Sequence, residues 1–156
     1  MIKEINNEHW GAFEALFKTH FEQTTQLYPN DIWYRAMFDY MYWKKQEHII
    51  DIFGAYHAHT LIGFIQVQVD TPLSDWCQRI GYGFIRELYV HPNHRLQSYG
   101  QLLVQHVERK FHTKQVPAIY LTTEKNNLFW QKMGYYEKGI CDENGLIICE
   151  KECVYE

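Results

Sequence analysis

The stretch that decides the fold is Glu87–Gln101, which reads ELYVHPNHRLQSYGQ. It begins within an alternating apolar segment, residues 84–90, which is typical of a β-strand and is stopped by Pro92. A polar turn follows, and apolar residues then recur at helical spacing, namely Leu102, Leu103 and Val107. The sequence therefore predicts a strand, a loop and a helix in direct succession, with the helix starting near residues 98–100.

Such a junction suits an anion, above all a pyrophosphate. The first backbone N–H groups of a helix have no partner within the helix, and the helix dipole places its positive end there. Ser98 and Gly100 are small, so a phosphate could approach the backbone closely. A glycine at a strand–turn–helix junction also occurs for structural reasons alone, so the loop by itself does not decide the function.

The order of these parts resembles motif A of the GNAT superfamily of N-acetyltransferases. The chain has a strand ending L-x-V-x-P, then Arg95-x-x-Ser98-x-Gly100, then a helix with paired leucines. In that family the loop reads Gln/Arg-x-x-Gly-x-Gly/Ala, and its amides hold the pyrophosphate of acetyl-CoA. Ser98 stands where the family usually has its first glycine. If the backbone there needs a positive φ, serine costs about 1–2 kcal/mol.

A second stretch, Asn126–Tyr135 (NNLFWQKMGY), resembles the C-terminal motif of the same family, F/L-Y-E-K-x-G-F. Trp130 occupies the position where the family commonly has a tyrosine that acts as general acid. An indole N–H donates a hydrogen bond but does not release a proton at a useful pH. The departing thiolate must then take its proton from water, from the acceptor's own ammonium or from another side chain. Tyr135, at the family's Phe position, is expected to pack, and no general acid is assigned.

The acceptor amine must also lose a proton. An alkyl amine with a pKa of about 10.4 is almost fully protonated at pH 7, which corresponds to a penalty of about 4.6 kcal/mol. Glu87 lies on the strand that leads into the loop and alternates to a different face from Leu88 and Val90. In relatives, an acidic residue here binds or deprotonates the amine. The alternative is an ordinary surface carboxylate paired with Arg86 or a lysine.

The resemblance also implies the cofactor contacts. The main chain of residues 88–90 is expected to pair with the pantetheine arm, and the Val90 N–H to polarise the thioester carbonyl. Asn126 and Phe129 would face the arm from the next helix, although Asn126 could instead satisfy backbone groups at a helix start. The predicted cofactor-binding residues are Leu88, Tyr89, Val90, Arg95, Leu96, Gln97, Ser98, Tyr99, Gly100, Gln101, Asn126 and Phe129; the predicted catalytic residues are Glu87 and Val90.

The whole pattern predicts an α+β fold: one domain over residues 1–156, with a mixed, mostly antiparallel sheet of about six or seven strands flanked by about four helices. Strands are expected over residues 1–5, 49–57, 61–69, 81–90, 116–122, 135–141 and 146–152. The strand, helix and strand over residues 81–122 form a parallel β-α-β unit. The expected helix caps are Asn7 and Asp31. Gly134 is expected to end a helix over residues 125–133, and Asn144-Gly145 to form a hairpin turn.

Composition narrows the classes of function. The net charge of −4, without a Lys/Arg stripe, argues against nucleic acid as the main partner. The four cysteines form no C-x-x-C pair, and neither a signal-peptide core nor a membrane-length apolar run is present, so a cytoplasmic protein with reduced thiols is expected. His57 and His59 lie two residues apart but lack a third ligand nearby, so no metal site is expected.

The leading hypothesis is an acetyl-CoA-dependent N-acetyltransferase that transfers directly to a small amine or to a peptide or protein amino group. No cysteine lies in either motif, which disfavours a covalent intermediate. The alternative, motivated by Trp130, is a CoA-binding regulatory module without turnover. A P-loop is excluded because the Gly-Lys-Ser/Thr ending is missing. Tyr28, Trp33 and Tyr34 are candidates for substrate contact, and a homodimer is possible.

Overall fold

The structure, a computed structural model, describes residues 1–155 and confirms the predicted α+β fold. Within these residues seven strands form one sheet in the order β1-β2-β3-β4-β5-β7-β6. The strands are β1 (Ile2–Glu4), β2 (Asp51–His57), β3 (Thr60–Val69), β4 (Gly83–Val90), β5 (Ala118–Thr123), β6 (Tyr136–Cys141) and β7 (Ile147–Glu152). The α-helices are α1 (Trp10–Thr25), α2 (Asp31–Gln46), α3 (Tyr99–Thr113) and α4 (Leu128–Lys132), and short 3-10 turns are η1 (Asn7–His9) and η2 (Pro92–His94).

The predicted parallel β-α-β unit is confirmed. Strands β4 and β5, which are joined through α3, pair in parallel, with Gly83 opposite Ile119. Strand β1 is antiparallel to β2, and β7 is antiparallel to both β5 and β6. The chain forms two compact units: the first holds Met1–Gln66 and Glu87–Leu103, and the second holds Val67–Arg86 and the chain from Val104 onward.

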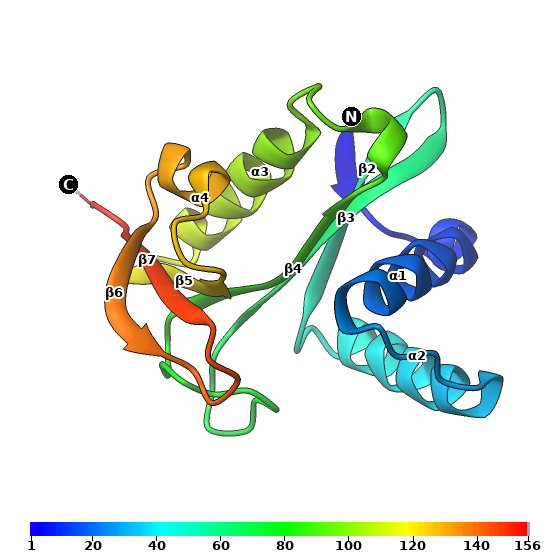
Figure 1. Ribbon diagram of the computed structural model, residues 1–156, viewed down its shortest axis with the longest axis horizontal. Coiled ribbons are helices and arrows are strands. Elements are labelled where there is room, and N and C mark those ends of the chain that lie inside the picture. Colours follow the sequence, from blue (N-terminus) through cyan, green and yellow to red (C-terminus); the bar gives the residue numbers. More distant parts are fainter. Residues whose placement is uncertain (156) are drawn as a thin grey trace. The chain divides into compact units, whose positions relative to one another are not determined.

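The core of the first unit is aromatic. Helices α1 and α2 lie beside one another against β2 and β3, as Figure 1 shows. Their contact surfaces are mainly aromatic because the rings recur at helical spacing and meet the alternating residues of the strands. Phe17 of α1 contacts both Phe38 of α2 and Phe64 of β3. The buried residues of this core are Ile5, Phe13, Phe17, Tyr34, Phe38, Met41, Ile50, Ile52, Tyr56, Leu61, Phe64 and Tyr89.

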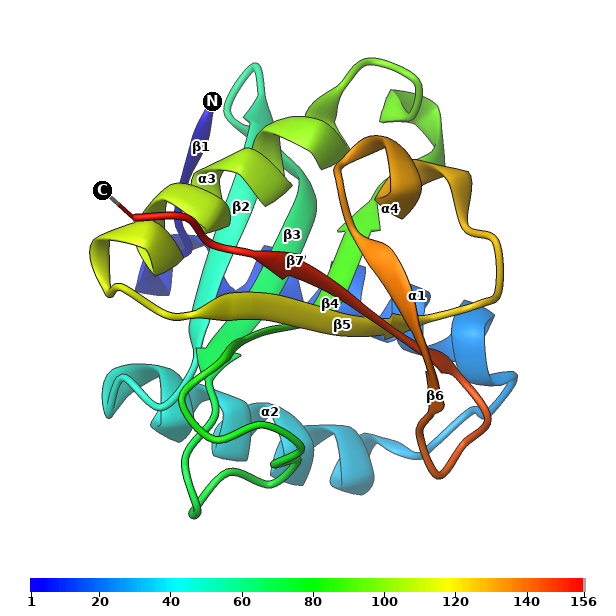
Figure 2. The ribbon, with the colours of Figure 1, turned by 90° about the vertical axis from the view of Figure 1, so that its left-hand side faces the viewer.

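The second unit has its own core. Figure 2 shows β5 and β7 side by side, with β6 paired to β7. Phe84 stacks on Tyr120 at 4.7 Å between ring centroids, and Ile148 completes this cluster. A Cβ at Gly83, the first residue of β4, would lie 2.9 Å from the ring of Phe111 near the end of α3. Glycine therefore lets α3 pack closely on β4, and a larger residue would force the ring to move.

The predicted helix starts were each displaced by one residue. Asn6, not Asn7, caps the turn before α1, since its Oδ1 accepts the N–H of His9. Asn30, not Asp31, caps α2 by accepting the N–H of Trp33. Both corrections have one cause: two adjacent side chains can cap, and the one with extended backbone does so.

Helix α4 is shorter than predicted, covering Leu128–Lys132 instead of residues 125–133. It starts late because Asn126 has a left-handed backbone, with φ of 60°, and Asn127 caps the helix through Trp130 N–H. The predicted end is confirmed, since Gly134 has φ of 92°. The hairpin at Gly145, with φ of 80°, is also confirmed, and Asp142 Oδ1 holds its turn by accepting two backbone N–H groups.

Three further features of residues 1–155 can be stated. No helix among them has the length and apolar character needed to cross a membrane. The four cysteines are free thiols, two of them exposed. No group of three or more His, Cys, Asp or Glu side chains in this part of the chain is placed to hold a metal ion.

Candidate active site

The loop after β4 ends in an open helix start. The first backbone bond of α3 runs from the Leu102 N–H to the Ser98 carbonyl at 3.0 Å. The N–H groups of Tyr99, Gly100 and Gln101 precede that bond and have no acceptor within the helix. They lie at the positive end of a 15-residue helix, so this part of the first unit is suited to bind an anion.

The loop holds two non-glycine residues in the left-handed backbone region. Ser98 has φ of 69° and Leu96 has φ of 61°. At the position of Ser98 the resembling family usually has glycine. The backbone at Ser98 does have a positive φ, which is the conformation that favours glycine. Each L-residue in this conformation costs about 1–2 kcal/mol. This part of the loop is therefore strained by its own sequence.

Arg95 ties the loop back to its strand. Its Nε donates to the Val90 carbonyl at 2.8 Å, and its guanidinium lies 5.5 Å from the centroid of the Tyr89 ring. Leu96, Gln97 and Gln101 are exposed, so their side chains are not part of a built pocket in the first unit.

Glu87 does not pair with Arg86 or a lysine. Its Oε2 lies 2.7 Å from Nε2 of His20, a residue of α1 that is 67 positions away in the sequence. The two side chains are 31% and 15% exposed, respectively. Glu87 is thus a half-buried carboxylate with a fixed partner, which leaves its second oxygen, Oε1, outside the contact.

Aromatic rings surround His20. Its ring centroid lies 5.0 Å from that of Tyr89 and 5.9 Å from that of Phe64. Phe17, one turn earlier on α1, meets the imidazole edge-on at 6.2 Å. These buried rings hold the imidazole against Glu87, and the carboxylate itself attracts positive charge.

The second motif, residues 126–135, belongs to the second unit. The contacts of its side chains are mainly packing and backbone contacts within that unit. Trp130 is only 8% exposed and packs on Phe129 and Tyr135. Asn126 donates its backbone N–H to Glu137 Oε2 at 2.7 Å, and the capping role falls to Asn127. Phe129 remains partly exposed.

Tyr135 packs as expected and is 2% exposed. Its hydroxyl donates to Glu108 Oε2 at 2.9 Å, and the same oxygen accepts from Lys151. Burial, together with the nearby Glu108 carboxylate, raises the pKa of Tyr135 far above that of an ordinary phenol. A phenol held in this way is unsuited to giving up a proton.

The predicted substrate aromatics differ in exposure. Tyr34 is buried, and its hydroxyl donates to Glu22 at 2.8 Å. Burial, and then that hydrogen bond, raise the pKa of Tyr34 to about 12. Tyr34 is therefore a core residue, whereas Tyr28 and Trp33 are exposed.

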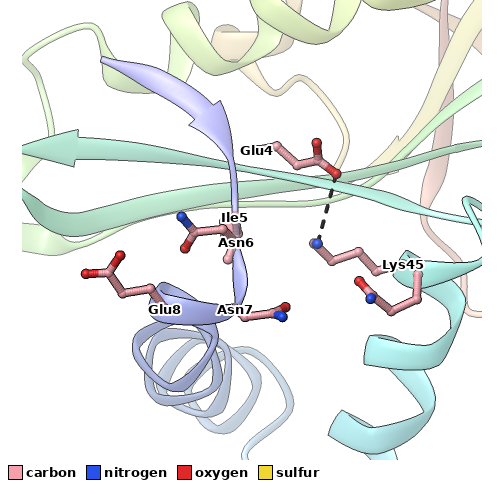
Figure 3. Close-up of a pocket in the computed structure, with 7 residues that line it drawn as sticks. Glu4, Ile5, Asn6, Asn7, Glu8 and Lys45 are labelled. Atoms are coloured by element: carbon pink, nitrogen blue, oxygen red, sulfur yellow. Dashed lines mark ion pairs between the residues drawn. The ribbon is translucent and has the colours of Figure 1, made fainter.

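A separate polar pocket lies at the start of the chain (Figure 3). It has a volume of about 480 Å³, and its main polar groups already have partners. Lys45 is 8% exposed and lies 4.0 Å from Glu4. Asn6 caps η1, and Asn7 accepts the hydroxyl proton of Tyr42 at 2.8 Å. The contacts of Glu4 and Asn7 join β1 and η1 to α2, and we assign no ligand to this pocket.

Sequence reasoning missed His20. A signal was present, since His20 follows Phe13 and Phe17 at seven and three residues and so shares the buried face of α1. A polar residue on an apolar helix face needs a partner. Its partner could not be named, because no local pattern links α1 to β4.

Comparisons with known proteins identify the family and the fold. The sequence model of the acetyltransferase (GNAT) family matches residues 3–135. A comparison with curated protein sequences gives no match.

Solved structures share the fold. The chain aligns with the PaiA N-acetyltransferase from Thermoplasma acidophilum in complex with coenzyme A, with TM-score 0.71, 17% identity and 98% of both chains covered. It aligns with a ribosomal-protein-alanine N-acetyltransferase from Brucella melitensis, with TM-score 0.76, 14% identity and 98% and 99% covered. It also aligns with an aminoglycoside 6'-N-acetyltransferase complexed with coenzyme A, with TM-score 0.74, 16% identity and 100% and 98% covered.

The resemblance drawn from the two motifs is thus confirmed over most of the chain. The strand order, the strand–loop–helix after β4 and the family match all agree. The chain belongs to the GNAT family of acetyltransferases.

Proposed function

We propose that the protein transfers the acetyl group of acetyl-CoA directly to the nitrogen of a cationic amine. The observation that carries this proposal is the half-buried carboxylate of Glu87, which His20 of α1 holds. Glu87 lies on β4, and the loop after this strand leads to the start of α3. An acidic group and an anion-binding helix start then lie on one continuous segment, Glu87–Leu103, of one compact unit. We propose one domain over residues 1–156. We also propose a cytoplasmic location, with which four free thiols are consistent.

The residues of this segment fit the cofactor. Acetyl-CoA supplies an activated thioester and a pyrophosphate. The N–H groups of Tyr99, Gly100 and Gln101 are suited to hold the pyrophosphate, since they have no helical acceptor. The Val90 N–H is proposed to polarise the thioester carbonyl, and the main chain of Leu88 and Tyr89 to bind the pantetheine arm. Cofactor contacts from Asn126 and Phe129 remain predictions.

Glu87 is proposed to bind the acceptor and accept its proton. A carboxylate attracts an ammonium group, and the half-buried position of Glu87 limits the screening of that attraction by water. Removing the ammonium proton at neutral pH costs about 4.6 kcal/mol for an ordinary amine. A positioned carboxylate base contributes typically about 10²–10⁴-fold in rate, which is the scale of the help required.

No side chain of the second motif is proposed as the proton donor to the thiolate. Trp130 is a buried indole, and the pKa of Tyr135 is raised by burial and by Glu108. Water or the acceptor's own nitrogen is left as the source. With the proton taken from either of these sources, the replacement of tyrosine by Trp130 is compatible with turnover.

The test is the release of coenzyme A thiol in the presence of a panel of amines. The panel includes spermidine, an aminoglycoside and a peptide beginning with alanine, because two structural neighbours are described as acting on an aminoglycoside and on a protein alanine. We expect amine-dependent release with at least one cation. Release at the background rate with every amine, despite tight acetyl-CoA binding, would favour the regulatory module instead.

A further inference from the structure

We propose that His20 is a positioning residue that holds the Glu87 carboxylate in the orientation that meets the acceptor amine, with Thr24 fixing the state of the imidazole. This inference rests on the proposed function. It assigns a role to α1, whereas both sequence motifs lie in the C-terminal half of the chain. It also explains why a polar residue lies on the buried face of an otherwise aromatic helix.

The hydrogen-bond geometry defines one arrangement. His20 Nε2 lies 2.7 Å from Glu87 Oε2, and Nδ1 lies 3.4 Å from the hydroxyl of Thr24. An ionised carboxylate only accepts hydrogen bonds, so Nε2 must carry the proton of this contact. In a neutral imidazole Nδ1 is then an acceptor, and the Thr24 hydroxyl is the donor that suits it.

The imidazole is also held sterically. Phe64 meets the ring at an interplanar angle of 79° and Phe17 at 81°, while Tyr89 lies 5.0 Å away on β4. Rings on several sides prevent the histidine from turning away from its partner. Glu87 Oε2 is therefore fixed, and Oε1 is the oxygen available to the acceptor. Positioning of this kind matters because displacing a reacting group by about 1 Å can cost about 10²-fold.

The test compares His20→Leu and His20→Gln, with the neighbouring exposed Thr19→Val as the matched control on α1. Glutamine keeps an N–H donor but does not titrate, and leucine removes the donor. We expect kcat to fall about 10-fold to 100-fold in His20→Leu, with the KM for acetyl-CoA unchanged. The Gln variant should recover most of kcat, because it restores a donor to Glu87.

Equal loss of kcat in the Leu and Gln variants, or wild-type kcat in His20→Leu, would overturn the positioning role. A second readout needs no acceptor. In protein labelled with ¹⁵N-histidine at pH 8, NMR should show His20 as the Nε2–H tautomer, with this preference weakened in Thr24→Val. The Nδ1–H tautomer in the wild type overturns the inference, whereas absent thiol release with a correct tautomer counts against the proposed function alone.

Discussion

Two carboxylates, Asp70 in the second unit and Glu87 in the first, differ in how many of their oxygens are hydrogen-bonded within the protein. Asp70 is 1% exposed and its oxygens are fully engaged: they accept from the Gln68 amide at 2.9 Å, the Tyr120 hydroxyl and the Arg79 N–H. Glu87 is half-buried, with one oxygen held by His20. Both are anchored, but only Glu87 keeps an oxygen outside its contact.

The difference indicates where chemistry can take place. A buried carboxylate whose two oxygens both accept hydrogen bonds from its neighbours stabilises its surroundings and is closed to a substrate. Arg79 extends the Asp70 cluster by pairing with Glu150 at 2.9 Å, which closes it further. A carboxylate that is anchored on one side only is positioned for its free side, which is the arrangement an acceptor-binding group needs.

The largest expected effect is on turnover. Glu87→Gln keeps the size of the side chain and removes the charge and the basic oxygen. We expect kcat/KM for the amine to fall about 10²–10⁴-fold in the thiol-release assay, because a base contributes on this scale. Urea unfolding should be nearly unchanged, since the pair is partly exposed. Wild-type turnover in this variant would remove Glu87 from the mechanism.

Asp70→Asn should act on stability instead. The change leaves buried donors poorly matched, so we expect a loss of about 2–4 kcal/mol in the free energy of unfolding. The matched control is Asp39→Asn, an exposed carboxylate paired with Arg35 at 3.0 Å, which should cost at most about 0.5 kcal/mol. Equal effects in the two variants, measured by urea unfolding, would contradict the role given to the Asp70 cluster.

Alkaline pH should weaken the Asp70 cluster. Burial, and then the hydrogen bond to Asp70, raise the pKa of Tyr120 well above that of an ordinary phenol. The folded state thus favours the neutral phenol. Its contribution is complete below about pH 10, where unfolded tyrosines titrate, and is lost as the pH rises further.

Tyr120→Phe tests this sign. The variant should be less stable than wild type at pH 8, because it lacks the bond to Asp70, and the difference should narrow above pH 10. The exposed Tyr28→Phe is the control and should track the wild type throughout. A gap between Tyr120→Phe and wild type that stays constant from pH 8 to pH 11, in urea unfolding, would refute the direction.

The smallest expected effect concerns the loop before α3. Ser98→Gly removes the penalty of a positive φ, and we expect a gain of about 1 kcal/mol in the free energy of unfolding. Gln97→Gly is the control, since glycine there should only add freedom to the unfolded chain. A gain in both variants, or in neither, would show that the conformation of Ser98 carries no cost.

Much of the fold could be predicted because its signals are local. Alternation gave the strands, Pro92 and Gly134 marked ends, and the two motifs gave the order of elements. The caps at Asn6 and Asn30 were misplaced by one position because the adjacent residue has nearly the same capping ability.

Only the part of the site that lies on one continuous stretch of sequence could be predicted. The segment from Glu87 to Gly100 is contiguous, so its residues could be chosen from sequence. The His20–Glu87 pair spans 67 positions and depends on how α1 packs, which no short pattern encodes. The buried state of Trp130 likewise depends on its packing against Tyr135.

The most direct test is calorimetric titration of acetyl-CoA into the wild type, Gly100→Trp and Gly11→Trp. The two glycines match, since each is the second residue of an α-helix, and a Cβ at Gly11 meets no atom within 4 Å. We predict micromolar binding to wild type and Gly11→Trp, and its loss in Gly100→Trp, whose bulk covers the helix start. Unchanged binding in Gly100→Trp, or none in the wild type, would contradict the assignment of this loop to acetyl-CoA.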